Sequence, residues 1–170
     1  GNPVRCQSCH DEGEPQLNFS AAIHGFHANY LTDQGPEACA SCHPGRPEGV
    51  TRAYRGIHRT VGLDCTNCHG EMADHALSLL VAERQAGKAS AEKMAALLTP
   101  MTVGSTEEIQ PRKPWVNEPD CLTCHVNFQP PEALDAFNQW TKSEADLYRM
   151  RTGGAGLMCA ACDGSPHALY

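Results

Sequence analysis

Apolar residues recur at helical spacing in one stretch of this chain, between about His75 and Leu98. Their intervals of three or four residues would line one face of an α-helix. Gly87 interrupts the pattern and Pro100 follows it, so we expect two helical pieces, the second ended by the proline. The residues that carry the pattern are Ala76, Leu77, Leu80, Val81, Met94, Leu97 and Leu98.

A further helix is predicted from about Pro131 to Arg151, because proline is favoured in the first helical turn and Gly153-Gly154 provides a stop. The four prolines among residues 99–119 predict an extended crossing segment between the two helical regions. No stretch shows the strict apolar–polar alternation of a half-buried strand. We therefore predict a mainly irregular chain with a few α-helices and little or no β-sheet.

All ten cysteines fall into five Cys-x-x-Cys pairs, and four of the pairs continue directly into histidine. Cys-x-x-Cys-His is the attachment signature of c-type haem, in which the thiols bind the porphyrin and the imidazole binds the iron. Covalent haem would also supply apolar surface to a chain with only 6% aromatic residues. The complete motifs are Cys6/Cys9/His10, Cys39/Cys42/His43, Cys65/Cys68/His69 and Cys121/Cys124/His125.

The fifth pair, Cys159/Cys162, is followed by Asp163 in place of histidine. Three interpretations stay open. Asp163 replaces the imidazole at a haem, another residue binds that haem's iron, or the thiols carry no haem and stay free or form a disulfide. The histidine count favours a haem, because four of the nine histidines lie in complete motifs and five remain as second ligands. We therefore predict five haems c, with these candidate second ligands: His24, His27, His58, His75 and His167.

Two other uses of paired cysteines fit the sequence less well. Two pairs could form a tetrahedral zinc site with four thiolates, but such a site does not need a histidine directly after each pair. Short Cys-x-x-Cys disulfides suit redox catalysts rather than a structural framework. With enough histidines available, the methionines are treated as packing residues, although Met158 could approach a fifth haem.

The motifs resemble those of bacterial multihaem c-type cytochromes, in particular pentahaem ones. The resemblance rests on the four complete motifs, on the sequence HGFH at His24–His27, and on the segment Cys162–His167. That last segment is similar to the CHGSPH ending of such cytochromes, from which Asp163 departs. The resemblance implies irons that mostly bind two imidazoles each, low reduction potentials and closely stacked haems. The family includes soluble electron carriers and cytochromes that polymerise into extracellular wires.

We expect one multihaem module over residues 1–170. Within it, a three-haem lobe of residues 1–75 and a two-haem lobe of residues 116–170 would be joined by a helical segment, 76–115. A formal charge of −7 argues against nucleic acid as a partner and for basic redox proteins. No apolar run approaches the 20 residues of a transmembrane helix.

These observations predict an electron-transfer protein of the periplasm, the cell surface or the extracellular space, since covalent haem is attached outside the cytoplasm. Self-association into a conducting filament is a further hypothesis. No catalytic residue is predicted for an electron carrier. The alternative is a reductase for a small oxyanion, with an open iron near Asp163 and Arg149 or Arg151 as a nearby cation.

Overall fold

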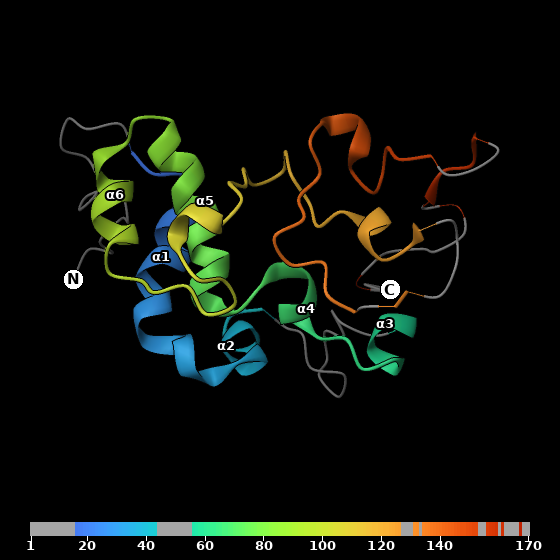
Figure 1. The fold of residues 1–170 in the computed structure, drawn as a ribbon, viewed down its shortest axis with the longest axis horizontal. Coiled ribbons are helices and arrows are strands. Elements are labelled where there is room, and N and C mark those ends of the chain that lie inside the picture. Colours follow the sequence, from blue (N-terminus) through green and yellow to red (C-terminus); the bar gives the residue numbers. More distant parts are fainter. Residues whose placement is uncertain are drawn as a thin grey trace, which may run out of the picture.

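Helices and irregular segments make up the described part of the protein (Figure 1). The computed structural model describes residues 16–43, 56–126, 131–132, 134–152, 156–159, 161 and 167. Strand pairing within these ranges is limited to two isolated antiparallel bridges, Pro119 with Trp140 and Thr152 with Met158. The prediction of a mainly helical and irregular chain with little sheet is confirmed at this level.

Three helices, α1 (Phe19–Leu31), α5 (Met72–Gln85) and α6 (Ala89–Ala95), pack side by side, at the left in Figure 1. Leu77, Leu79 and Leu80 of α5 are fully buried in the core between them. The buried residues of α1 are all small, namely Ala21, Gly25 and Ala28. The backbone of α1 therefore approaches the backbone of α5 closely. A side chain at Gly25 would collide with Met94 of α6.

The two predicted helical pieces between His75 and Leu98 are confirmed. α5 ends at Gln85, Gly87 adopts φ +81° in the turn, and α6 ends at Ala95, before Pro100. A left-handed φ favours glycine, which explains why the break falls there. The segment 99–119 contains no α-helix, but it is bent rather than extended as predicted, with bends at 101–105, the 3-10 turn η3 (Thr106–Glu108) and a left-handed φ of +66° at Trp115.

A buried carboxylate connects α5 to this irregular segment. Asp74 lies in the first turn of α5, has no exposed surface, and accepts hydrogen bonds from the backbone N–H groups of Met101 (2.7 Å) and Thr102 (3.0 Å). A negative charge is favourable near a helix N-terminus, and both loop donors are satisfied. The chain leaving α6 is therefore fixed back onto the start of α5.

The helix predicted over Pro131–Arg151 is wrong for the described residues of that range. They contain only a 3-10 turn, η6 (Glu144–Asp146), and Asn138 has a left-handed φ of +63°. Apart from the bond of Arg151 N–H to the Leu147 carbonyl, backbone groups of this range form long-range hydrogen bonds or tight turns. Ala136 N–H donates to the Asn67 carbonyl at 2.8 Å, and Thr141 N–H donates to the Glu118 carbonyl at 2.8 Å. Tertiary pairing has overridden local helical preference.

The remaining elements are short. The helices are α2 (Pro36–Ala40), α3 (Ile57–Thr60) and α4 (Cys65–His69), and the remaining 3-10 turns are η2 (Thr32–Gln34) and η4 (Cys121–Thr123). In Figure 1, α4 lies between the three-helix unit and the segment 134–152, in agreement with the Ala136–Asn67 hydrogen bond. No helix in the described ranges has the length and apolar character needed to cross a bilayer.

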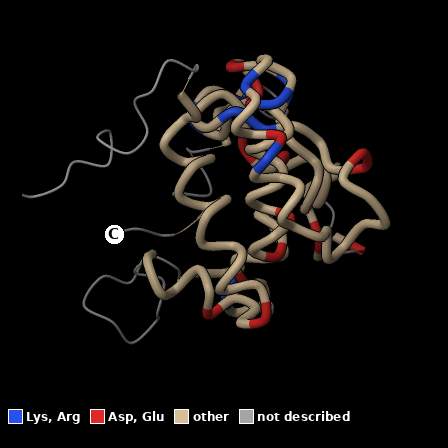
Figure 2. Tube along the Cα trace, turned by 90° about the vertical axis from the view of Figure 1, so that its left-hand side faces the viewer, with Lys and Arg blue, Asp and Glu red and all other residues tan. Residues whose placement is uncertain are grey.

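Charged residues are distributed unevenly over the face seen in Figure 2, where lysine and arginine gather at the connection between α5 and α6. Lys88 there pairs with Glu83 at 2.5 Å, and Arg84 pairs with Glu92 at 3.5 Å. Glu83 also accepts from the backbone N–H of Asn18, the N-cap residue of α1. Lys88 and Arg84 are therefore matched by acidic neighbours.

Gly70 separates α4 from α5 and provides a test of this packing. Its φ is +83°, and an added Cβ would lie 2.5 Å from two ring carbons of Phe137. We expect Gly70→Ala to lower the free energy of unfolding by about 2–4 kcal/mol, from left-handed backbone strain together with overpacking. Gly87→Ala is the control, because φ is similar there but no atom lies within 4 Å. Gly87→Ala should lower the free energy of unfolding only through left-handed backbone strain, by about 1–2 kcal/mol. Equal losses by chemical denaturation would contradict the Phe137 contact.

Candidate functional site

The three complete Cys-x-x-Cys-His motifs within the described residues share one local conformation. In each, the backbone closes a single helical turn from the first cysteine to the histidine. His43 N–H donates to the Cys39 carbonyl at 2.8 Å, His125 N–H donates to the Cys121 carbonyl at 2.9 Å, and α4 itself spans Cys65–His69. Positions i, i+3 and i+4 share one helix face, so each turn presents both thiols and the imidazole on one side.

Aspartate caps two of these turns. Asp64 accepts from the backbone N–H of Thr66, and Asn67 completes the capping box by accepting from Asp64 N–H. Asp120 accepts from the N–H of Leu122 at the start of η4. Aspartate is a preferred N-cap residue because its side chain satisfies N–H groups that have no partner within the helix. The residue before the first cysteine therefore starts the turn that the motif needs.

The structure pairs each of these three motif histidines with a histidine from outside the motifs. The ring centres are 6.1 Å apart in all three pairs, namely His24 with His43, His69 with His167, and His58 with His125. The planes are inclined by 4°, 21° and 51°, so the constant feature is the separation and not the mutual tilt.

This separation fits two imidazoles bound to one metal ion. Bonds from a protein imidazole nitrogen to a metal are about 2.0–2.1 Å long. Since the ring centre lies about 1.1 Å behind that nitrogen, imidazoles on opposite sides of one ion have centres about 6.3 Å apart. Rings in face-to-face contact would instead bring their atoms to about 3.5–4.0 Å. The residues present therefore fit an iron with two axial imidazoles.

Hydrogen bonds orient three of the non-motif histidines. Nδ1 of His24 lies 2.7 Å from the Ser20 carbonyl, Nδ1 of His27 lies 2.9 Å from the Ile23 carbonyl, and Nδ1 of His75 lies 3.3 Å from the His69 carbonyl. With Nδ1 as the donor, Nε2 carries the lone pair. Histidines that bind metals typically donate their other ring N–H in this way, which fixes both tautomer and ring orientation.

Burial keeps several imidazoles of the cluster neutral. Desolvation, followed by the positive charge of Arg112, lowers the pKa of His69 to about 4 and the pKa of His75 well below its usual range. Desolvation is also the largest cause that lowers the pKa of His24 and of His167. A neutral imidazole is the form that binds a metal, so these side chains need no deprotonation before ligation at neutral pH.

The pairs adjoin one another. The ring centre of His75 lies 4.5 Å from that of His24 and 5.8 Å from that of His69, so His75 links the first two pairs. His167 is near enough to His58 and to His43, one histidine of each other pair, for their charges to lower its pKa.

Thiols from successive motifs adjoin as well. Cys39 and Cys65 are within hydrogen-bonding reach of each other, which together with burial raises the pKa of Cys39. Burial, and then the neighbouring Cys124 and Cys121, raises the pKa of Cys68 to about 11. Cys121 in turn lies close enough to Cys159 for their charges to interact. The motifs thus form a continuous series in space, in the same order as in the sequence.

Cys42 differs from the other thiols of this series. The structure leaves Cys42 exposed, whereas the other described cysteines are partly buried, namely Cys39, Cys65, Cys68, Cys121, Cys124 and Cys159. The physical reason is local, because Cys42 and His43 lie on the exposed turn that follows α2, past the half-buried Cys39. Cofactor attachment at Cys42 therefore stays a prediction that depends on the motif alone.

Arg112 is a buried cation beside this cluster, and it was missed in the sequence because no local pattern marks it. It is 8% exposed, its Nη2 lies 3.4 Å from Nε2 of His75, and its Cζ lies 5.1 Å from the ring centre of Trp140. Burial lowers the pKa of Arg112 to about 10, so the group stays charged at neutral pH. The ion pairs formed among the described residues do not include it.

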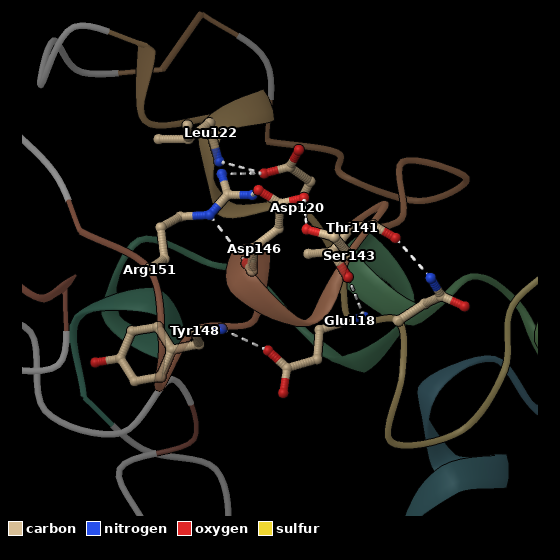
Figure 3. A network of polar contacts seen from close by, with 9 residues as sticks. Glu118, Asp120, Leu122, Thr141, Ser143, Asp146, Tyr148 and Arg151 are labelled. Carbon is tan, nitrogen blue, oxygen red and sulfur yellow. Dashed lines mark hydrogen bonds and ion pairs between the residues drawn. The ribbon is translucent and has the colours of Figure 1, made fainter.

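Arg151 holds the fourth motif against the C-terminal part of the chain (Figure 3). Nη1 donates to Asp120 at 2.8 Å, Nη2 lies 3.3 Å from the Asp146 carboxylate, and Nε donates to the Asp146 carbonyl at 2.9 Å. The Arg151 carbonyl accepts from the N–H of Cys159 at 3.0 Å. Arg151 neither ends a helix nor points to an open site, and it ties Cys121 and Cys159 to one framework.

Several predicted site residues are not tested by these contacts. Cys6, Cys9, His10, Cys162 and Asp163 lie outside the described residues. His27 has no ring contact with a motif histidine among the described residues, and His75 lies edge-on to His69, which is already paired with His167. In the same part of the chain, no three histidine, cysteine or acidic side chains converge on one metal position. An iron with two axial imidazoles does not need such a group.

Comparison with family models, with curated proteins and with solved structures found no match for this chain. The assignment of a function therefore depends on the residues and their geometry.

The Arg151 network can be tested by removing its charge. Arg151→Met should lower the free energy of unfolding by about 2–3 kcal/mol, because Asp120 and Asp146 lose their charged partner. Arg149→Met is the control, since Arg149 is exposed, and it should change stability by less than about 0.5 kcal/mol. Chemical denaturation of both variants measures the difference. Similar losses in the two would show that the network contributes little.

Proposed function

We propose that this protein is an electron-transfer protein that carries several c-type haems, most of them with two axial histidines. The observation that carries the proposal is the set of three imidazole pairs at 6.1 Å, each joining a motif histidine to a distant histidine. The spacing of the histidines along the sequence does not require that these pairs form. Each pair joins one attachment motif to one candidate second ligand, and this happens at three motifs.

The residues have distinct roles in this proposal. The two thiols of each motif would hold a haem, and the motif histidine would bind its iron. His24, His167 and His58 would provide the second imidazoles at the second, third and fourth motifs. The bound haems would supply one-electron Fe(III)/Fe(II) couples. The protein holds the ligands in place, lowers by burial the pKa values of His24, His69 and His167, and keeps neighbouring sites in contact.

The first and fifth sites stay a prediction. Two histidines of the cluster, His27 and His75, are available for the two cysteine pairs that remain, Cys6/Cys9 and Cys159/Cys162. His10 is the proposed proximal ligand of the first site. The fifth site has Asp163 in place of a histidine, and its ligands stay open between the interpretations given above.

Electron transfer agrees better with this geometry than oxyanion reduction does. A catalytic iron needs a vacant coordination position, whereas each of the three pairs would fill both axial positions. Arg151, one of the cations expected near Asp163, is engaged by Asp120 and Asp146. We further propose a location outside the cytoplasm, where covalent haem is attached, and redox proteins as partners. Filament formation stays a hypothesis.

Intact mass measures the number of haems directly. We expect protein produced with a haem-attachment system to carry five covalent haems and to show the reduced-minus-oxidised spectrum of haem c. Replacing both thiols of one complete motif, as in Cys121→Ala with Cys124→Ala, should remove one haem equivalent. A colourless protein with no mass gain would reject the proposed function, and a gain of four would reject the fifth haem.

Second-ligand variants test the pairing. His58→Ala should convert one haem from low to high spin while the haem count stays the same, because His58 is not part of an attachment motif. His24→Ala and His167→Ala should each do the same at another haem. Electron paramagnetic resonance measures the change, and added imidazole should reverse it. Asn29→Ala, an exposed change on α1, is the control. Low-spin spectra in the histidine variants would contradict the assigned pairs.

A further inference from the structure

Arg112 is a buried cation for which the described part of the protein provides no anion. Its exposed fraction is 8%, and its Nε is buried without a hydrogen-bond partner. Its side-chain contacts are Nη2 with His75 Nε2 at 3.4 Å and Cζ over the Trp140 ring at 5.1 Å. Its backbone N–H donates to the Ser78 carbonyl at 2.8 Å, which fixes the residue against α5.

This arrangement is unfavourable unless an anion is added. Burying a charged group without a partner costs several kcal/mol, and proteins usually pair such a group or neutralise it. Arg112 keeps its positive charge at physiological pH, because burial lowers its pKa only to about 10. A guanidinium offers five N–H donors in a planar fork that matches a carboxylate, and within the described residues the Nε of Arg112 has no acceptor.

The position of Arg112 defines where that anion would lie. Arg112 contacts His75, and the His75 ring lies against both His24 and His69. His24 and His69 belong to two different imidazole pairs. The anion would therefore lie at the junction of the two proposed haem sites, on the side of α5.

We propose that Arg112 anchors a haem propionate at this junction and raises the reduction potentials of the two haems bound by His24–His43 and His69–His167. The inference rests on the proposed function. A propionate is a carboxylate carried by the same group that the imidazole pairs would bind. A fixed positive charge near an iron favours the ferrous form, which has one positive charge fewer.

The His58–His125 pair provides an internal reference. Arg112 contacts His75, which adjoins the other two pairs, whereas His58 and His125 are not among the side-chain contacts of Arg112 in the described residues. Since electrostatic influence falls with distance, the haem at this pair should respond least to a change at Arg112.

The test compares Arg112→Gln, which removes the charge, with Arg112→Lys, which keeps it. Haem content is measured first by intact mass. Redox titration followed by the haem-methyl NMR signals then resolves the couples, with His58→Ala used to assign the reference haem. In Arg112→Gln we expect the two couples beside Arg112 to shift to more negative potentials and the reference couple to stay in place. Arg84→Gln is the matched control, because Arg84 lies on α5 but pairs with Glu92 near the surface.

Arg112→Lys tests the propionate contact even if the glutamine variant does not fold. A lysine cannot reproduce the planar fork, so the propionate-bending bands in the resonance Raman spectrum should shift while the potentials change less. Unchanged bands in Arg112→Lys, or unchanged potentials in a haem-loaded Arg112→Gln, would overturn the inference and leave the haem assignment intact. A wild-type protein without haem would overturn both.

Discussion

Imidazoles from distant parts of the chain meet in pairs, and the proposed function depends on this one interaction. His69 and His167 lie far apart in the sequence, and so do His58 and His125, yet each pair has the same ring separation as His24 and His43. A metal ion imposes one distance whatever the local fold, whereas ordinary side-chain packing does not. The common ring separation is therefore consistent with the proposal that each pair binds a metal ion.

Apolar packing supports only part of this arrangement. The main core lies between α1, α5 and α6, and it reaches the later chain mainly through Ile109, Phe137 and Trp140. Beyond this core, polar contacts connect the segments. Asp74 binds the backbone of residues 101–102, and Arg151 binds Asp120 beside the fourth motif. Hydrogen bonds of this kind orient segments but add little net stability. Covalent haem would supply the apolar surface that the second half otherwise lacks.

Local spacing explains which predictions succeeded. The two-part helix around Gly87 and the irregular segment after it follow from apolar periodicity and proline positions. The helix over 131–151 failed, because its backbone pairs with Asn67 and Glu118, and no local pattern contains that information. The same limit applies to the site. The histidines could be named from the motifs and the count, but their pairing needs the fold, and so does the exposure of Cys42. Arg112 is important because it is buried beside His75, and no sequence pattern predicts that contact.

The distribution of ligands over the fold explains how such a chain could hold several irons in fixed relation. His24 and His75 lie on the long helices α1 and α5, which pack against each other through the best-formed core. His69 ends α4, which leads through Gly70 into α5, so the same rigid unit positions it. His58 and His125 come from short elements outside that unit. Rigid elements position a site more accurately than loops do. One histidine of each pair beside Arg112 is therefore positioned by helix packing, whereas the third pair has no member in that unit, and the polar network around Arg151 holds the motif of His125.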